Sequence, residues 1–396
     1  MATVHEPTVV GVAHFNAAED AAALRGAMKG FGTDEDAIIE ILTSRSNAQR
    51  QAISQAFTLE YGRDIIEDLK SELGGHFEDV IVALMLPPAE YLCKELHHCM
   101  EGMGTDEKVL VEILCTRTKK EIAEIVEAYE RLYNRPLAEH MCSETSGDFR
   151  RLLTLIVTAK KQGARDEEAG VDQARAAEAA QQLYDAGEAK WGTDEEIFNK
   201  ILAHESFGQL RAIFEEYKNI AGRTIEQAIK AEIAGELSEA LSAIVECVEN
   251  QAAWFAQRLR DAMQGLGTDD RTLIRIVVSR SERDLAAIKR EYEVLYDKTL
   301  GSEVRESAPF RVCLVSVECV ENSAAWFAKR LRSSMQGGGT EDKALIRIIV
   351  NRSEIDLAAV KREYESLYDK TLQSDVAQGE TSGDYRKALI ALLGPA

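Results

Sequence analysis

Long apolar runs are missing from this sequence of 396 residues. None approaches the roughly 20 residues that a membrane-spanning helix needs, so no such helix is expected. Residues 1–7 also lack a basic segment followed by an apolar one, and we expect no signal peptide there. A hydrophobic content of 45% and a charged content of 29% indicate a soluble globular protein with a large core.

Paired cysteines are missing as well. The seven cysteines are odd in number, scattered, and without C-x-x-C spacing. This argues against a disulfide framework or a zinc motif, and it predicts free thiols that fill core positions in a reducing compartment. They are Cys93, Cys99, Cys115, Cys142, Cys247, Cys313 and Cys319.

Positive charge is scarce. Lysine and arginine number 47 against 68 aspartates and glutamates, which gives a formal net charge of −21. Such a surface repels nucleic acid and anionic lipid headgroups alike unless a cation intervenes. We therefore expect no nucleic-acid partner.

Signatures of catalysis and phosphate binding are also absent. The sequence has no G-x-S-x-G, no G-x-x-x-x-G-K-[ST], and no Cys/His constellation of recognisable spacing. The acidic stretch 34–36 is no EF-hand, because the sixth-position glycine and the closing glutamate are lacking. We expect no enzymatic activity. Turnover on a phospholipid would revive the rival interpretation, a lipid hydrolase.

What the sequence does contain is one short loop motif in five copies, four of the form Gly-x-Gly-Thr and one, in the third copy, of the variant form Lys-Trp-Gly-Thr. Successive copies are 72, 88, 75 and 72 residues apart. A near-fixed period of this size predicts an array of similar units that complete one another's cores. The second glycines of the copies are Gly32, Gly104, Gly192, Gly267 and Gly339.

Each loop separates two expected helices. The first helix of the first unit is expected over 16–28, and after the loop Ile38, Ile41 and Leu42 form the stripe of a half-buried helix. Thr33 is the expected N-cap of that second helix. Further helices follow in each unit, and no alternating strand pattern occurs. The prediction is an all-α chain with about five helices per unit.

The expected divisions are an N-terminal tail, five repeats and one polar linker before the third repeat. The last two repeats are near duplicates, since 245–250 returns as 317–322 and 254–255 returns as 326–327. The segments are the tail 1–13, repeat one 14–85, repeat two 86–158, the linker 159–170, repeat three 171–245, repeat four 246–317 and repeat five 318–396.

The glycines of the loop suggest a metal site. Glycine permits positive φ and close backbone approach, so carbonyl oxygens can converge on a hard cation such as Ca²⁺. An acid recurs 39 residues after the loop threonine in three copies, as Glu72, Glu144 and Glu232. One copy alone would be interpreted as a helix–loop–helix turn with an N-cap. Five copies, three with the acid at one offset, favour metal binding.

The loop, followed 39 residues later by an acid, resembles the calcium loop of the annexins, and the likeness covers nearly the whole chain. The triplets 44–46, 116–118 and 279–281 resemble the family's arginine between its second and third helices. The resemblance implies a curved right-handed superhelical disc of five-helix repeats, with calcium loops on the convex face. There the ion is shared between loop carbonyls, the distant carboxylate and a phospholipid phosphate.

Carried over residue by residue, the resemblance implies five ligand sets, in which all but the acids act through backbone carbonyls. The sets are Met28, Gly30, Gly32 and Glu72 in repeat one; Met100, Gly102, Gly104 and Glu144 in repeat two; Gly187, Lys190, Gly192 and Glu232 in repeat three; Met263, Gly265, Gly267 and Glu306 in repeat four; and Met335, Gly337, Gly339 and Glu380 in repeat five.

Two copies depart from this pattern. Glu306 lies 38 residues after its loop threonine, and Glu380 lies 40 residues after its own. We therefore rank the sites of repeats one, two and three first, that of repeat five next and that of repeat four last. Trp191, inside the third loop, is expected to contact the membrane, because its ring suits the lipid interface.

The implied function is reversible, calcium-dependent binding to anionic phospholipid membranes. The protein would be cytoplasmic, peripheral on membranes when calcium is raised, and capable of lateral self-association there. The alternative is a metal-independent helical interaction scaffold. That alternative is favoured if calcium leaves thermal stability and tryptophan emission unchanged.

The fifth repeat is unusual, because the annexins known to us carry four or eight repeats. The junction into repeat five copies the junction into repeat four, so repeat five would head for space that repeat one already holds. We predict that it either lies outside the ring of repeats or displaces repeat four from the closing position.

Overall fold

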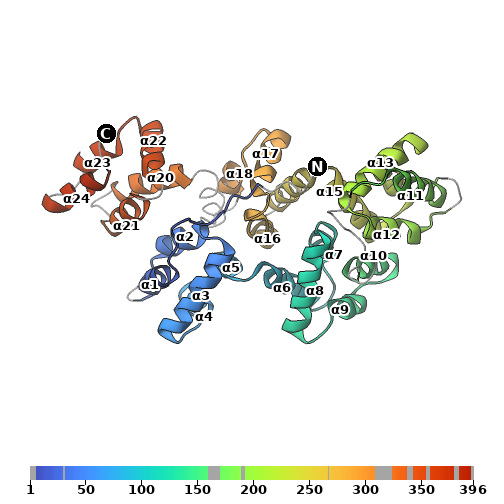
Figure 1. Ribbon diagram of the computed structural model, residues 1–396, viewed down its shortest axis with the longest axis horizontal. Coiled ribbons are helices and arrows are strands. Elements are labelled where there is room, and N and C mark those ends of the chain that lie inside the picture. The colour runs from blue at the N-terminus through green and yellow to red at the C-terminus, as the bar shows by residue number, and fades with distance from the viewer. Residues whose placement is uncertain are drawn as a thin grey trace. The chain divides into compact units, whose positions relative to one another are not determined.

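The computed structural model describes residues 6–29, 32–158, 170–188, 192–265, 267–307, 323–336, 342–353, 357–378 and 383–393. Every regular element in these ranges is a helix (Figure 1), which confirms the all-α fold class. No helix within them is both long enough and apolar enough to cross a membrane.

Contacts divide the chain into two compact units. The first consists of Met1–Pro7 and Ala83–Leu300, and the second of Thr8–Val82 and Gly301–Ala396. Repeats two and three and residues 246–300 of repeat four therefore belong to the first unit, whereas repeat five and nearly all of repeat one belong to the second.

Repeat one has five helices whose ends follow local capping rules. They are α1 (Ala17–Ala27), α2 (Glu35–Ser44), α3 (Asn47–Tyr61), α4 (Ile65–Glu72) and α5 (Gly75–Met85). Asn16 caps α1 by accepting the N–H groups of residues 18 and 19. Ser46 and Gln49 form a capping box at the start of α3, which ends at Gly62 with a φ of 65°.

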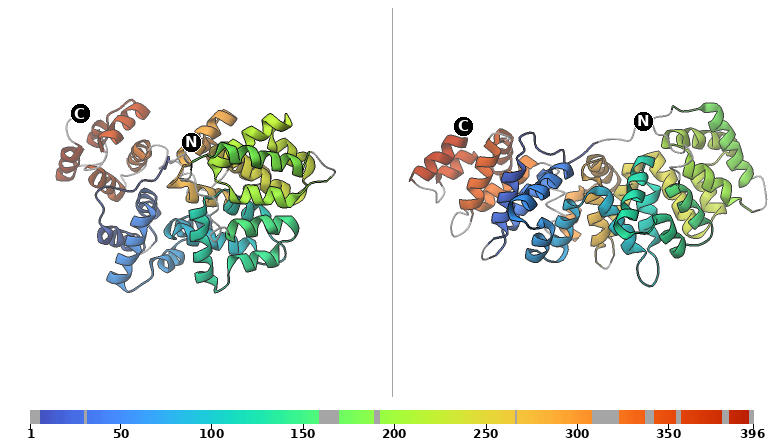
Figure 2. Two further views of the ribbon diagram at one scale, coloured as in Figure 1. Left: turned by 45° about the vertical axis from the view of Figure 1, so that its right-hand side comes forward. Right: turned by 60° about the horizontal axis from the view of Figure 1, so that its bottom comes forward.

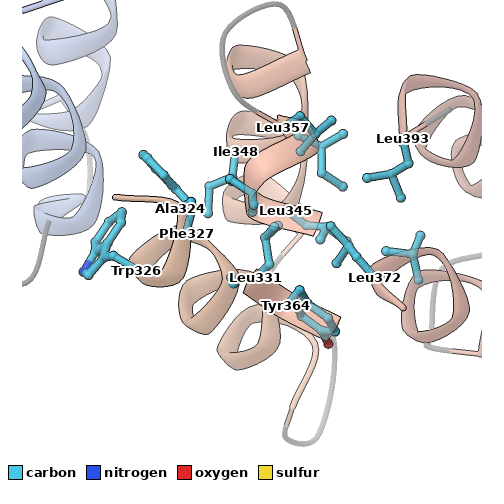
Figure 3. Packing of buried hydrophobic residues seen from close by; sticks show 14 of the residues in the cluster. Ala324, Trp326, Phe327, Leu331, Leu345, Ile348, Leu357, Tyr364, Leu372 and Leu393 are labelled. Atoms are coloured by element: carbon cyan, nitrogen blue, oxygen red, sulfur yellow. The ribbon is translucent and has the colours of Figure 1, made fainter. Parts of the chain in front are cut away.

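Repeat five also has five helices, and they are packed on repeat one. They are α20 (Ser323–Ser334), α21 (Asp342–Ser353), α22 (Leu357–Tyr368), α23 (Leu372–Gln378) and α24 (Gly383–Leu393). Their buried side chains form one apolar cluster (Figure 3), and Ile39 of repeat one belongs to it. Arg330 also donates a hydrogen bond to Asp36 of repeat one. Repeats one and five are therefore in contact within the second unit.

The first unit contains repeats two and three and repeat four as far as Leu300 (Figures 1 and 2). Repeat two has α6 (Pro88–Cys99), α7 (Glu107–Leu110), the π-helical turn η1 (Val111–Cys115), α8 (Lys119–Tyr133), α9 (Leu137–Glu144) and α10 (Gly147–Thr158). Repeat three has α11 (Gln173–Ala186), α12 (Glu195–His204), α13 (Phe207–Ala221), α14 (Ile225–Glu232) and the first part of α15 (Gly235–Met263). Helices α11 and α13 lie side by side in both figures.

Repeat four begins within α15, at a break in that helix. Asn250 has the non-helical angles φ −149° and ψ 91°, so the helix that closes repeat three and the helix that opens repeat four are joined there. The repeat continues with α16 (Asp270–Ser281), α17 (Leu285–Tyr296) and α18 (Leu300–Ser307). Its expected fifth helix, like the linker 159–169, falls outside the described residues.

Repeats two and four are joined by a buried polar cluster. Both carboxylate oxygens of Glu112, on η1, accept hydrogen bonds of 2.7 Å from the Arg275 guanidinium. The side chains of Glu112 and Arg275 are 0% and 1% exposed. Glu95 accepts hydrogen bonds of 3.0 and 2.9 Å from Arg271. These pairs join residues more than 160 positions apart in the sequence.

The prediction of free thiols is confirmed wherever the structure describes a cysteine. Cys93, Cys99, Cys115 and Cys247 are free and buried, and Cys142 is free and half-buried. Burial raises the pKa of the Cys93 and Cys99 thiols to about 12. The remaining two cysteines lie outside the described residues.

Candidate metal centres

The same backbone closure recurs in four of the loops. The N–H of the aspartate that follows the loop threonine donates to the carbonyl of the residue just before the loop, at 2.8–2.9 Å. Each of these loops is thereby tied at its base. The pairs are Asp34 with Ala27, Asp106 with Cys99, Asp194 with Ala186, and Asp269 with Ala262.

The aspartates, rather than the threonines, begin the second helices. The prediction that Thr33 caps this helix is wrong, because α2 starts at Glu35 and Asp34 accepts the N–H of Ala37 at 3.0 Å. Asp106 caps α7 in the same manner. The threonine hydroxyl is consequently free to make a different contact, described below.

The loop glycines adopt conformations that other residues avoid. All six described positions have φ between 83° and 126°, and a Cβ atom at any of them would meet no other atom within 4 Å. Glycine is therefore required here for its backbone angles rather than for close packing. The positions are Gly32, Gly102, Gly104, Gly192, Gly265 and Gly267.

Loop two is described in full, and its carbonyl groups are available to a cation. Among the described residues, nothing donates a hydrogen bond to the carbonyl oxygens of Met100, Gly102 or Gly104. The Met100 side chain is only 2% exposed and anchors the start of the loop. The side chains of Met28 and Met263 are buried in the same way, and Met335 is half-buried.

The distant acids lie at the loops. In repeat one the Thr33 hydroxyl donates to the Glu72 carboxylate at 3.0 Å. In repeat two the Thr105 hydroxyl donates to the backbone carbonyl of Glu144 at 3.2 Å. In repeat three Thr193 makes the same contact with Glu232 at 3.5 Å. The constant offset of 39 residues thus corresponds to a recurring contact between the threonine and the acidic residue.

Repeat four lacks this contact. Its Thr268 hydroxyl donates instead to Asp270, on the adjoining helix, at 2.7 Å. Glu306 is exposed near the end of α18, and no bond from Thr268 to Glu306 occurs among the described residues. Gly265 and Gly267 adopt the positive φ of the other loops, but the threonine contact with the acid is replaced by one with Asp270.

The three acids differ in their surroundings. Glu232 accepts a hydrogen bond of 3.3 Å from Arg223, which also binds Glu188 within the third loop. Burial opposes the charged guanidinium, but the hydrogen bonds to Glu188 and Glu232 and the negative charge of Glu188 together outweigh it and raise the pKa of Arg223. Glu144 accepts a hydrogen bond from Ser143 at 3.1 Å. A cation bound in repeat three would therefore compete with Arg223 for the carboxylate of Glu232.

Some predicted site residues fall outside the described residues, so the structure says nothing of them. They are Gly30, Lys190, Trp191, Gly337, Gly339 and Glu380. Gly187, which opens the third loop, is described. It is buried and has a φ of −113°, unlike the other loop glycines.

The donor set of the described sites suits calcium. Within the described ranges, no group of three or more His, Cys, Asp or Glu side chains is placed to hold a metal ion. A site in these loops would rest on backbone oxygens and one carboxylate. Such an all-oxygen set fits a hard cation like Ca²⁺ and disfavours zinc, which prefers His and Cys ligands.

Sequence reasoning missed one residue of the second loop. Met103 stands between the two glycines and is fully exposed, which is unusual for a large apolar side chain. The same loop position holds Phe31, Trp191 and Leu266 in the sequence, although these three lie outside the described residues. A bulky apolar residue just before the second loop glycine, in four of the five copies, was the available signal.

Comparison with known proteins gives a consistent result. The Annexin family model matches residues 19–84, 91–156, 178–244, 254–309 and 326–392. Annexin B10 of Drosophila melanogaster is 62% identical over 298 residues, which cover 75% of this chain and 92% of that protein. Annexin A6 of Gallus gallus is 39% identical over 430 residues, which cover 98% of this chain but 63% of that longer protein.

Solved structures agree. Annexin III has a TM-score of 0.77 and 43% identity, over 80% of this chain and 98% of its own. A calcium-bound annexin (Sm)1 has a TM-score of 0.72 and 30% identity, over 80% of this chain and 93% of its own. In each case the match leaves about a fifth of the present chain uncovered.

Proposed function

Because this chain belongs to the annexin family, we propose that it binds anionic phospholipid membranes reversibly, through calcium ions shared between its loops and lipid phosphates. The observation that supports this most is the recurring contact between the loop threonine and the acid 39 residues later. It gives each of three loops one carboxylate-bearing residue beside a bend rich in backbone oxygens.

Residues of repeats one, two and three hold the ions. The ligand sets are Met28, Gly30, Gly32 and Glu72; Met100, Gly102, Gly104 and Glu144; and Gly187, Lys190, Gly192 and Glu232. Repeat five is a weaker candidate, and repeat four is the weakest because Thr268 binds Asp270 rather than an acid before the fifth helix. Calcium supplies positive charge and open positions for phosphate oxygens.

The net charge explains why calcium is required. A protein of charge −21 and an anionic bilayer repel each other, and bound calcium reverses the sign locally. Several weak sites act together through effective concentration, so adhesion is tight, cooperative and reversed by a chelator. The exposed Met103 side chain, and Trp191 by its place in the sequence, add apolar contact at the lipid interface.

In the cell this mechanism describes a cytoplasmic protein without enzymatic activity, which becomes peripheral on membranes and associates laterally when calcium rises. The five repeats at 14–85, 86–158, 171–245, 246–317 and 318–396 are its working units.

Vesicle sedimentation tests the proposal. Vesicles of phosphatidylserine and phosphatidylcholine should pellet the protein with calcium and release it with chelator, because each ion bridges a loop and a phosphate. Vesicles of phosphatidylcholine alone are the control and should pellet much less protein. Equal pelleting with calcium and with chelator contradicts the proposal. A scaffold that needs no metal would also show no calcium effect on its melting temperature.

A further inference from the structure

Two positions recur in every repeat, one on each side of the loop. The first lies ten residues before the loop threonine and the second lies three residues after it. Glu95 occupies the first position in repeat two, and it binds Arg271, at the second position in repeat four, at 2.9 Å. Likewise Arg330, at the first position in repeat five, binds Asp36, at the second position in repeat one. Both of these contacts join opposite charges.

A third instance of this pairing breaks the rule. Arg258 occupies the first position in repeat four, and Lys108 occupies the second position in repeat two. Both line one cavity in the first unit. Lys108 thus occupies the position that Asp36 has in repeat one. Two cations therefore occupy the positions at which Arg330 and Asp36 form an ion pair. Among the described residues, neither side chain makes an ion pair.

The cavity has a volume of about 290 Å³ and lies where repeats two, three and four meet. Its lining includes Ser242, which is 7% exposed, and Trp254, whose ring centroid is 5.9 Å from the Arg258 guanidinium. The Ser242 hydroxyl and the Arg258 Nε are both buried without a hydrogen-bond partner among the described residues. Unsatisfied buried donors are costly, and a bound acceptor would satisfy them.

The acids of the lining do not neutralise the two cations. Glu246 lies 3.7 Å from Lys230, a third basic residue of the cavity. Burial, followed by the neighbouring Glu226, raises the pKa of Glu246. Glu239 is exposed at the rim. Among the residues that the structure describes, Lys108 and Arg258 have no acidic partner, so the cavity can accept an anion.

We propose that this cavity binds a phosphate group independently of calcium. Phosphate offers three or four acceptor oxygens to ammonium, guanidinium and hydroxyl donors, whereas a carboxylate offers two. The volume lies at the small end of ligand pockets, about 300–1,000 Å³. Trp254 and Val111 add apolar wall for an organic substituent.

The phosphate group has two natural sources. Lys108 follows Asp106 of the second loop by two residues, and Lys230 precedes Glu232 by two. The cavity is therefore lined by residues that flank two candidate calcium sites. A lipid headgroup could reach it there, and so could a soluble phosphate.

Titration calorimetry on the full chain in chelator tests the site, with inorganic phosphate and with a short-chain phosphatidylserine below its micelle concentration as the two probes. Ionic strength is held constant with chloride. Wild-type protein should bind at least one probe at one site per chain, and Lys108→Asp should weaken this at least about tenfold by removing a charge-assisted hydrogen bond. Lys120→Asp is the matched control, because both lysines are the second residue of a helix and both are exposed.

The outcomes separate cleanly. Binding of either probe that is lost in Lys108→Asp and kept in Lys120→Asp supports the site, and the probe that binds identifies the source. Without ligand, Lys108→Asp should also melt above wild type, because it restores the ion pair seen between Arg330 and Asp36. No binding of either probe by wild type, or equal binding by Lys108→Asp, overturns the proposal. The sedimentation test of calcium-dependent vesicle binding does not depend on this result. Either proposal can therefore be contradicted without the other.

Discussion

Replacing Glu72, Glu144 and Glu232 together by glutamine raises the calcium concentration required for vesicle binding by at least about a hundredfold, because the avidity that linked sites add is of that order or more. Glutamine keeps the size of each side chain and removes the charge that the hard cation needs. The measurement is a calcium titration of sedimentation with phosphatidylserine vesicles.

The matched control is Glu306→Gln in repeat four. There the loop threonine binds Asp270 rather than Glu306, so this single change should leave the titration within about twofold of wild type. Glu72 and Glu232 are exposed, and unchanged thermal melting of the triple variant would show that the fold is intact. A triple variant with the wild-type calcium requirement would contradict the assignment of these acids.

Replacing Arg275 by methionine lowers the free energy of unfolding by about 3–5 kcal/mol, because it leaves the charge of Glu112 buried without its partner. Both Glu112 oxygens are bonded to Arg275, and both side chains are almost completely removed from water. The measurement is urea unfolding of the full chain, followed by circular dichroism.

Arg271→Met is the control for that change. The Arg271 side chain is 45% exposed, and Glu95 keeps Arg275 at 3.4 Å when Arg271 is gone. Its cost should be about 1 kcal/mol, because Arg271 is itself exposed to water and Glu95 retains a cationic neighbour. The double variant Glu112→Leu with Arg275→Met should recover much of the loss, since no charge is then buried alone. Equal destabilisation by the two single arginine variants would contradict the argument.

The fold class could be predicted from the sequence because the signal was repeated. Each copy placed an apolar stripe after a glycine loop, and five copies made a chance match improbable. The offset of 39 residues also carried structural information, since it marks the contact between Thr33 and Glu72 and its counterparts. The repeat of the loop and the spacing of 39 residues between its threonine and the acid can both be counted in a single sequence.

Contacts between distant segments could not be predicted. The pairing of Glu112 with Arg275 joins residues 163 positions apart, and no spacing rule in the sequence connects them. The docking of repeat five on repeat one depends on Ile39 and the ion pair of Arg330, which the near-duplicate sequence of repeat four does not indicate. The error at Thr33 has a different origin, because Asp34 is an equally good N-cap one residue further on.

Crystals grown with calcium replaced by a lanthanide give the most direct test of the central claim. Anomalous difference maps should show ions at loops one, two and three, about 2.3–2.6 Å from the loop carbonyl oxygens and from the carboxylates of Glu72, Glu144 and Glu232. Repeat four should show the weakest peak. Ions bound elsewhere, or loops that stay empty at saturating metal, would contradict the claim.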